Sequence, residues 1–167
     1  MSTTSEDLQS AFAGESQANR KYLFFAEKAD EEGHKQIARL FRAAAEAETV
    51  HARNHFRVIE GIKATGDNLA VAIVGESHEF TEMYPAFIKQ AEIEGNDKAK
   101  DSFDLANKVE RIHHRLFMAA LDMLRRSQTA EEKPFFVCQH CGNTVEGEAP
   151  ERCPVCGRPK SMFKRID

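Results

Sequence analysis

The stretch CQHCGNTVEGEAPERCPVCG, residues 138–157, contains all four cysteines of this 167-residue chain. They form two Cys-x-x-Cys pairs, Cys138 with Cys141 and Cys153 with Cys156, and a glycine follows each pair. This spacing is typical of a site in which four thiolates hold one metal ion. The segment after residue 134 has few large apolar residues, and so short a segment needs a metal or disulfides to fold. We therefore predict a small metal-bound domain.

Two questions about these cysteines stay open at this stage. Two structural disulfides are the alternative to a metal, although nothing in the sequence marks the chain as exported. If the site holds a metal, four thiolates in this spacing bind iron and zinc equally well. The sequence therefore predicts iron or zinc at the four cysteines.

Composition and charge exclude several classes of partner. The first residues, MSTTSED, are polar and acidic and lack the apolar segment of a signal peptide, and the longest apolar run, residues 69–74, is too short to span a membrane. The net charge of −4 and the lack of a basic cluster argue against nucleic acid or an anionic membrane surface as partner. We expect a cytoplasmic protein that binds neither nucleic acid nor membrane.

The chain divides at the segment SQTAEEKP, residues 127–134, which lacks large apolar residues and ends in proline. We predict a helical domain over residues 1–128, a linker over 129–134 and a four-cysteine domain over 135–167. Long helical periodicity covers four stretches of the first domain: residues 5–32, 34–60, 68–94 and 97–126. These lengths predict an all-α domain, a four-helix bundle. Pro85 lies inside the third stretch and predicts a kink or a helix start nearby.

Each predicted helix carries ionisable residues on the apolar stripe that would face the core. These residues are Glu15, Glu48, His51, Glu79, Glu82, Glu110 and His113. Unpaired buried carboxylates are strongly destabilising, and several of them close together would repel one another. Two metal cations would cancel this charge and use the carboxylate oxygens as ligands. The sequence therefore predicts a two-metal site in the bundle.

Two of the helices contain the pattern Glu-x-x-His, in Glu48 with His51 and in Glu110 with His113. Residues three apart lie on one face of a helix, so each pair can offer an oxygen and a nitrogen to the same ion. One such pair is weak support, because it is common on solvated helices. The combination of glutamates with two Glu-x-x-His pairs is the pattern of di-iron carboxylate bundles. Tyr22, two turns after Glu15, is a candidate hydrogen-bond donor to the site, and a simple core role is the alternative.

Taken together, these motifs resemble the rubrerythrin family. The resemblance rests on Glu15, the two Glu-x-x-His pairs, the element Glu79-x-x-Glu82-Met-Tyr-Pro and the two cysteine pairs, and it covers nearly the whole chain. It implies a ferritin-like four-helix bundle followed by a small rubredoxin-like domain. This tail departs from the usual rubredoxin in having phenylalanines where a tryptophan and tyrosines are common, which weakens the preference for iron over zinc there.

The resemblance also implies roles for the residues. Glu48 and Glu110 would bridge two irons, Glu79 and His113 would complete one of them, and Glu15 would hold the other. That second iron would exchange Glu82 for His51 on reduction, since ferric iron favours carboxylate oxygen and ferrous iron accepts imidazole nitrogen.

The activity that the resemblance implies is a peroxidase that reduces hydrogen peroxide to water. The four-cysteine iron would relay electrons from an upstream reductase, because its closed coordination leaves no position for substrate. Family members are commonly dimers, and an exchanged helix pair is compatible with the sequence. Two alternatives stay open: a ferroxidase that stores iron, and a non-enzymatic zinc-ribbon protein that binds partners.

Overall fold

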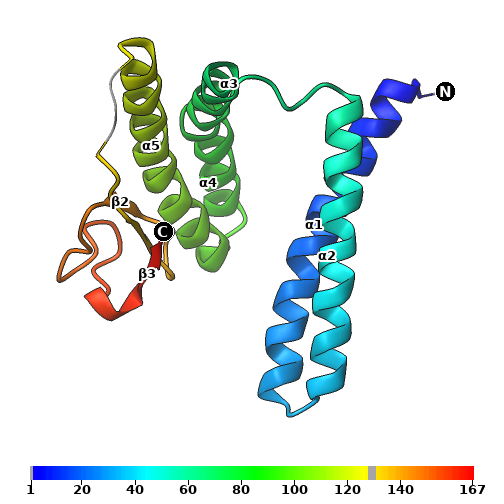
Figure 1. Ribbon diagram of the computed structural model, residues 1–167. Helices are drawn as coiled ribbons and strands as arrows, with labels where there is room; N and C mark the ends of the chain where they lie inside the picture. Colours follow the sequence, from blue (N-terminus) through cyan, green and yellow to red (C-terminus); the bar gives the residue numbers. More distant parts are fainter. Residues whose placement is uncertain (1, 128–130) are drawn as a thin grey trace. The chain divides into compact units, whose positions relative to one another are not determined.

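The structure, a computed structural model of the chain, describes residues 2–127 and 131–167. Helices occupy the region up to residue 125, and the β-strands lie in the cysteine-rich segment after residue 134 (Figure 1). The chain forms two compact units, residues 1–63 and residues 64–167. Each unit is described by itself.

The first unit is a hairpin of two helices, α1 (Thr4–Glu31) and α2 (Lys35–Val58). Thr3 and Glu6 form a capping box at the start of α1, in which each side chain accepts a hydrogen bond from the backbone of the other. Gly33 has φ of 82° in the connecting turn, a conformation that favours glycine. The predicted break at this glycine is confirmed.

Small side chains line the contact between α1 and α2. The buried residues of the two helices are all alanines: Ala26, Ala29, Ala38, Ala45 and Ala52. Small side chains let two helices approach closely, which brings polar groups of one within reach of the other. The Asn19 amide of α1 donates hydrogen bonds to the Ala45 carbonyl at 2.7 Å and to Thr49 Oγ1 at 2.9 Å on α2. The alanine seam therefore fixes the register of the two helices.

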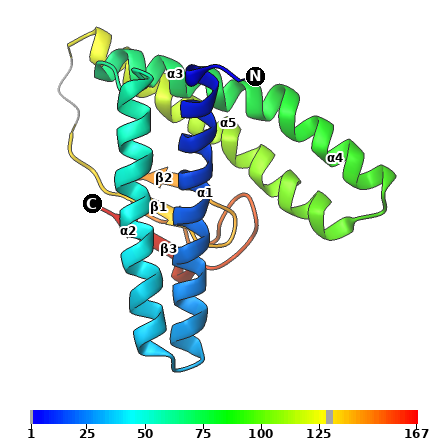
Figure 2. The same cartoon turned by 90° about the vertical axis from the view of Figure 1, so that its right-hand side faces the viewer.

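The second unit begins with α3 (Thr65–His78), the π-helix η1 (Glu79–Met83) and α4 (Tyr84–Ile93), followed by α5 (Asp97–Arg125). The first three elements form one continuous helical rod, which runs beside α5 (Figure 2). Gly95 has φ of 66° in the turn, and the Asn96 side chain caps α5 by accepting a hydrogen bond from the Ala99 N–H.

The π-helical turn lies where Pro85 disturbs the helix. Proline has no N–H to donate, and its ring clashes with the carbonyl four residues earlier in an α-helix. The wider π-turn accommodates this, and the Tyr84 N–H donates to the Glu79 carbonyl five residues back. α4 then begins at Tyr84 with the proline in its first turn. The helix start predicted near Pro85 is confirmed.

The four-cysteine segment forms a three-stranded antiparallel sheet in the order β2-β1-β3. Its strands are β1 (Phe135–Cys138), β2 (Thr144–Glu146) and β3 (Phe163–Ile166), with the short 3-10 helix η2 (Lys160–Met162) before β3. This segment belongs to the same compact unit as α3 to α5.

The predicted fold class is confirmed: long helices are followed by a small four-cysteine domain with a short sheet. The predicted domain limits, 1–128 and 135–167, stay a prediction, and residues 128–130 around the start of the linker lie outside the described residues. Within residues 2–127 and 131–167, no helix has the length and apolar character that crossing a membrane requires.

Candidate metal centres

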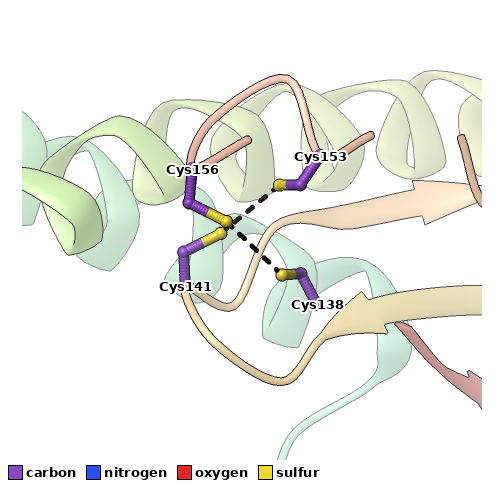
Figure 3. Close-up of side chains that lie close together, drawn as sticks. All are labelled: Cys138, Cys141, Cys153 and Cys156. Atoms are coloured by element: carbon purple, nitrogen blue, oxygen red, sulfur yellow. Dashed lines mark hydrogen bonds between the residues drawn. The ribbon is translucent and has the colours of Figure 1, made fainter. Parts of the chain in front are cut away.

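The four cysteine sulfurs point toward one another from two turns of the chain (Figure 3). Cys138 Sγ lies 3.7 Å from Cys156 Sγ, and Cys141 Sγ lies 3.6 Å from Cys153 Sγ. A disulfide bond joins its sulfurs at about 2.05 Å, so all four cysteines are free and the disulfide alternative is wrong. Around an ion with metal–sulfur bonds of about 2.3 Å, a tetrahedron places the sulfurs about 3.8 Å apart. The observed separations fit that geometry.

Backbone N–H groups surround these sulfurs. The Asn143 N–H donates to Cys141, and the Val155 and Cys156 N–H groups donate to Cys153. Burial acts to raise the pKa of Cys153, but the two N–H donors and the neighbouring thiols outweigh it and lower this pKa to about 7. Donors aimed at sulfur stabilise the thiolate, which is the form that binds metal.

A second cluster lies between α3 and α5. His113 Nδ1 is 2.7 Å from Glu110 Oε2 and 3.7 Å from Glu76 Oε2. The Glu76 Oε2 atom is buried and has no hydrogen-bond partner among the described residues. An unpartnered buried carboxylate oxygen is costly, and a cation beside it would remove that cost. The three side chains therefore fit a metal ion.

The pKa values in this cluster reflect crowded acidic groups. Burial raises the pKa of Glu76 to about 7, and the adjacent Glu110 carboxylate adds to the effect. Burial also acts to raise the pKa of Glu110, but hydrogen bonds with His113 and Glu76 together outweigh it and lower the pKa. The hydrogen bond with Glu110 raises the pKa of His113. The carboxylates around His113 therefore favour its positively charged form.

The third cluster lies in the helix hairpin and contains Glu15 of α1 with Glu48 and His51 of α2. Their ligand atoms lie within 4.8 Å of one another. His51 Nδ1 is 2.9 Å from Glu48 Oε2, and 54% of the His51 side chain is exposed. The structure thus brings these three predicted residues together, as it does Glu110 and His113.

The predicted pair Glu79 and Glu82 lies within the π-helix η1. Burial and the nearby Glu110 carboxylate raise the pKa of Glu79, which therefore lies close to the cluster of α3 and α5. The Glu82 side chain is 73% exposed, and its Oε2 lies 3.4 Å from His78 Nδ1. The structure does not bring Glu82 to either carboxylate cluster.

The reason is the local helical geometry. The sequence argument followed steps of three and four through residues 79–83, whereas a π-turn closes between residues five apart. Tyr84, five residues after Glu79, lies close enough to the carboxylates for their charges to change its pKa, and its ring is near those of Phe87 and Phe103. Burial raises the pKa of the Tyr84 phenol, and the charges of Glu110, Glu79 and Glu76 raise it further. Tyr84 is thus a residue at the site that the periodicity argument missed.

Glu76 was missed as well, although the sequence contains a signal for it. It lies four residues after Ala72 and three before Glu79, so it belongs to the same stripe of the helix. Tyr22, the candidate donor to the site, packs its ring against those of Phe25 and Phe41, with centroids 6.4 and 6.1 Å away. Its role at the site stays a prediction.

Helical carboxylate–histidine clusters combined with a closed four-thiolate site define a class of non-haem metalloproteins. The sequence model of rubrerythrin matches residues 6–121, and that of the rubrerythrin rubredoxin-like domain matches residues 136–164. The chain belongs to the rubrerythrin family.

Individual relatives agree over nearly the whole chain. Rubrerythrin-2 of Clostridium acetobutylicum is 35% identical, with 96% of this chain and 95% of that protein covered. Nigerythrin of Nitratidesulfovibrio vulgaris is 36% identical, with 96% and 85% covered. The solved structure of partially reduced nigerythrin matches with a TM-score of 0.58 at 36% identity, covering 99% of this chain and 88% of that one. The ferritin-like and rubredoxin-like assignments are confirmed.

The cofactors follow from the family and from the donor sets of this chain. Two iron ions belong to the carboxylate–histidine clusters of the helices, and one iron or zinc ion belongs to the four cysteines. The predicted cofactors are confirmed. Another solved structure is of fully reduced, all-ferrous nigerythrin, which marks that relative as a redox-active iron protein.

Proposed function

We propose that this protein is a peroxidase that reduces hydrogen peroxide to water. The proposal is supported by one combination: the unit of residues 64–167 holds a cluster with an unpartnered buried carboxylate oxygen, at Glu76, together with a closed site of four thiolates. The first offers an ion three side-chain ligands, and the second, closed by four thiolates, can only pass electrons. Iron storage would need the first and has no use for the second.

We assign Glu15, Glu48 and His51 to one iron and Glu76, Glu110 and His113 to another. When bound, ferrous irons would supply the two electrons that reduction of peroxide requires, and two protons would complete its conversion to two water molecules. The Tyr84 phenol keeps its proton at neutral pH because its pKa is raised, so Tyr84 can donate a hydrogen bond toward the carboxylates.

Large apolar side chains exposed on the hairpin, among them Phe24, Leu40 and Val58, support an assembly that covers them.

We assign to Glu79 the role of the carboxylate ligand that binds iron in the oxidised state and leaves it on reduction. The earlier candidate, Glu82, is largely exposed and paired with His78, whereas Glu79 is close enough to Glu110 and His113 for their charges to change its pKa. Glu79 thus takes the role that the sequence argument gave to Glu82. Glu79→Ala should slow peroxide turnover more than iron oxidation by oxygen, because the ferric ion loses a hard oxygen ligand. Glu82→Ala is the matched control and should leave both rates unchanged.

An upstream reductase would supply electrons to the four-cysteine site, and a homodimer is the assembly that we propose. The cytoplasm remains our predicted location, since free thiols that bind metal are typical of reducing compartments.

Anaerobic peroxide titration of the fully reduced, iron-loaded protein tests the activity. About 1.5 equivalents of peroxide should oxidise all three irons, because they hold three electrons and each peroxide accepts two, and the colour of ferric iron–thiolate should appear as the cysteine iron loses its electron. The ferroxidase alternative predicts a different result, in which oxygen reacts faster than peroxide and iron accumulates beyond the ligand sites. A colourless protein with zinc at the cysteines and no iron in the helices would support the zinc-ribbon alternative.

A further inference from the structure

Within residues 64–167, the first cysteine turn lies against α5 at the metal cluster. Val109, which directly precedes Glu110, is 2% exposed, and an added Cβ on Gly142 would lie 3.7 Å from Val109 Cγ1. Beside this contact, His113 Nε2 lies 3.0 Å from Thr144 Oγ1. The side chain of a strand in the cysteine domain therefore reaches a histidine of the helical cluster in the same chain.

The direction of this hydrogen bond follows from the number of protons. A threonine hydroxyl has one proton and two acceptor positions. Thr144 Oγ1 donates that proton to the Gly142 carbonyl, at 3.1 Å, and a carbonyl can only accept. The hydroxyl then accepts from His113, which places a proton on Nε2, and a hydrogen bond of the His113 ring to the Gly142 carbonyl favours the same placement. The other ring nitrogen, Nδ1, faces the Glu110 and Glu76 oxygens.

The backbone holds the threonine in place relative to the thiolates. The Gly142 N–H donates to the Cys138 carbonyl at 2.8 Å, and the Cys138 N–H donates to the Asn143 carbonyl at 2.9 Å. Asn143 is buried, with 1% exposed. These bonds make residues 138–144 a closed turn, so the Thr144 hydroxyl has little freedom to move away from His113.

We propose that Thr144 is a positioning residue that holds His113 in the tautomer with its proton on Nε2, and so directs Nδ1 to the metal. Gly142 is covalently bonded to Cys141, so the same two hydrogen bonds, from His113 to Thr144 and from Thr144 to Gly142, link the four-thiolate site to the helical cluster. The geometry thus makes the orientation of a metal ligand on α5 depend on the folded cysteine domain. The inference rests on metal binding at the proposed site but not on the reaction with peroxide.

The experiment uses the full chain loaded with zinc, which is diamagnetic and binds both thiolate and imidazole ligands. Nitrogen-15 NMR of the histidine rings should show His113, assigned by loss of its signals in His113→Gln, with a slowly exchanging proton on Nε2 and metal on Nδ1. Thr144→Val keeps the shape and suits a strand but lacks the hydroxyl. It should lose the slow proton, and zinc should bind the cluster about 10–100-fold more weakly, the usual effect of removing a partner of a metal ligand.

Thr144→Ser retains the hydroxyl and should restore both the slow proton and the zinc affinity. Ser161→Ala removes an exposed hydroxyl elsewhere in the same domain and should change neither. Thr144→Ala serves as a second variant without the hydroxyl if valine prevents the cysteines from binding zinc. The proposal is overturned if the hydroxyl-free variants keep the slow proton and the affinity, or if Thr144→Ser behaves as they do. A protein that shows the wild-type NMR signature but does not react with peroxide would instead reject the proposed function alone.

Discussion

Helices α2 and α5 each carry a Glu-x-x-His turn, but the two histidines lie in different surroundings. His51 Nδ1 lies 2.9 Å from Glu48, and His113 Nδ1 lies 2.7 Å from Glu110, so the motif produces the same local contact twice. The His51 side chain is 54% exposed, whereas that of His113 is 27% exposed because the cysteine domain lies against it. The comparison shows that one motif can give two different ligand environments. The neighbouring chain segment, not the motif, decides which one forms.

The largest effect should follow from removing the metal of the cysteine site. Structural metals of this kind contribute about 10–16 kcal/mol to folding, so Cys153→Ser or a strong chelator should unfold residues 135–167 and bleach an iron–thiolate colour. The helices should remain, because their seams and caps do not involve the cysteines. Circular dichroism and NMR would measure this, and the surroundings of His113 should become like those of His51. A tail that stays folded without metal would contradict the expectation.

The second prediction compares two glutamates six residues apart on the same helical rod. Glu76→Gln removes a charged oxygen from the cluster and should weaken metal binding there by at least the ~10–100-fold seen for loss of a supporting partner. Glu82→Gln, at an exposed side chain, should leave the affinity unchanged. Isothermal titration of the metal-free protein would measure both. Equal losses of affinity in the two variants would show that Glu82 also binds the metal.

The third prediction concerns the stability of the metal-free second unit, which should depend on pH because acidic groups are crowded around Glu76. The pKa of Glu76 is raised to about 7 in the folded state from an ordinary 4.5, so the folded state binds more protons between these values. Stability should therefore fall as pH rises from 4.5 through 7 and then level off, by roughly 1–3 kcal/mol.

Chemical unfolding of the metal-free protein at a series of pH values would measure this fall. Glu76→Gln has no titrating group and is the control, so the wild type should lose stability relative to it across the same interval. A difference between the two proteins that does not vary with pH would refute the assignment of the titration to Glu76.

The smallest effect should come from truncating the two histidines in the metal-free protein. His113→Ala leaves Glu110 without its donor in a partly buried site, which costs about 1–3 kcal/mol. His51→Ala breaks a more exposed pair, worth about 0–1 kcal/mol. Thermal unfolding of both variants would rank them, and a larger loss for His51→Ala would show that the comparison of the two helices is mistaken.

Part of the site was predictable because local spacing controls it. The interval of three residues in a helix is enough to set Glu48 against His51 and Glu110 against His113, whatever else surrounds them. The same reasoning failed across residues 79–83, since it assumed a regular α-helix. The turn before Pro85 is widened to a π-turn. As a result Tyr84, and not Glu82, lies close enough to the carboxylates for their charges to affect it.

The sequence by itself determined the four-thiolate site, the family and the helical carboxylate–histidine pairs, because each depends on residues close together in the chain. The tertiary structure alone decided that Glu76 completes the cluster on α5 and that Thr144 reaches His113. Those contacts join segments separated by more than 30 residues, and no helical or strand period relates their positions. Packing between elements sets them, because a buried oxygen or ring nitrogen takes the partner that the folded chain places beside it.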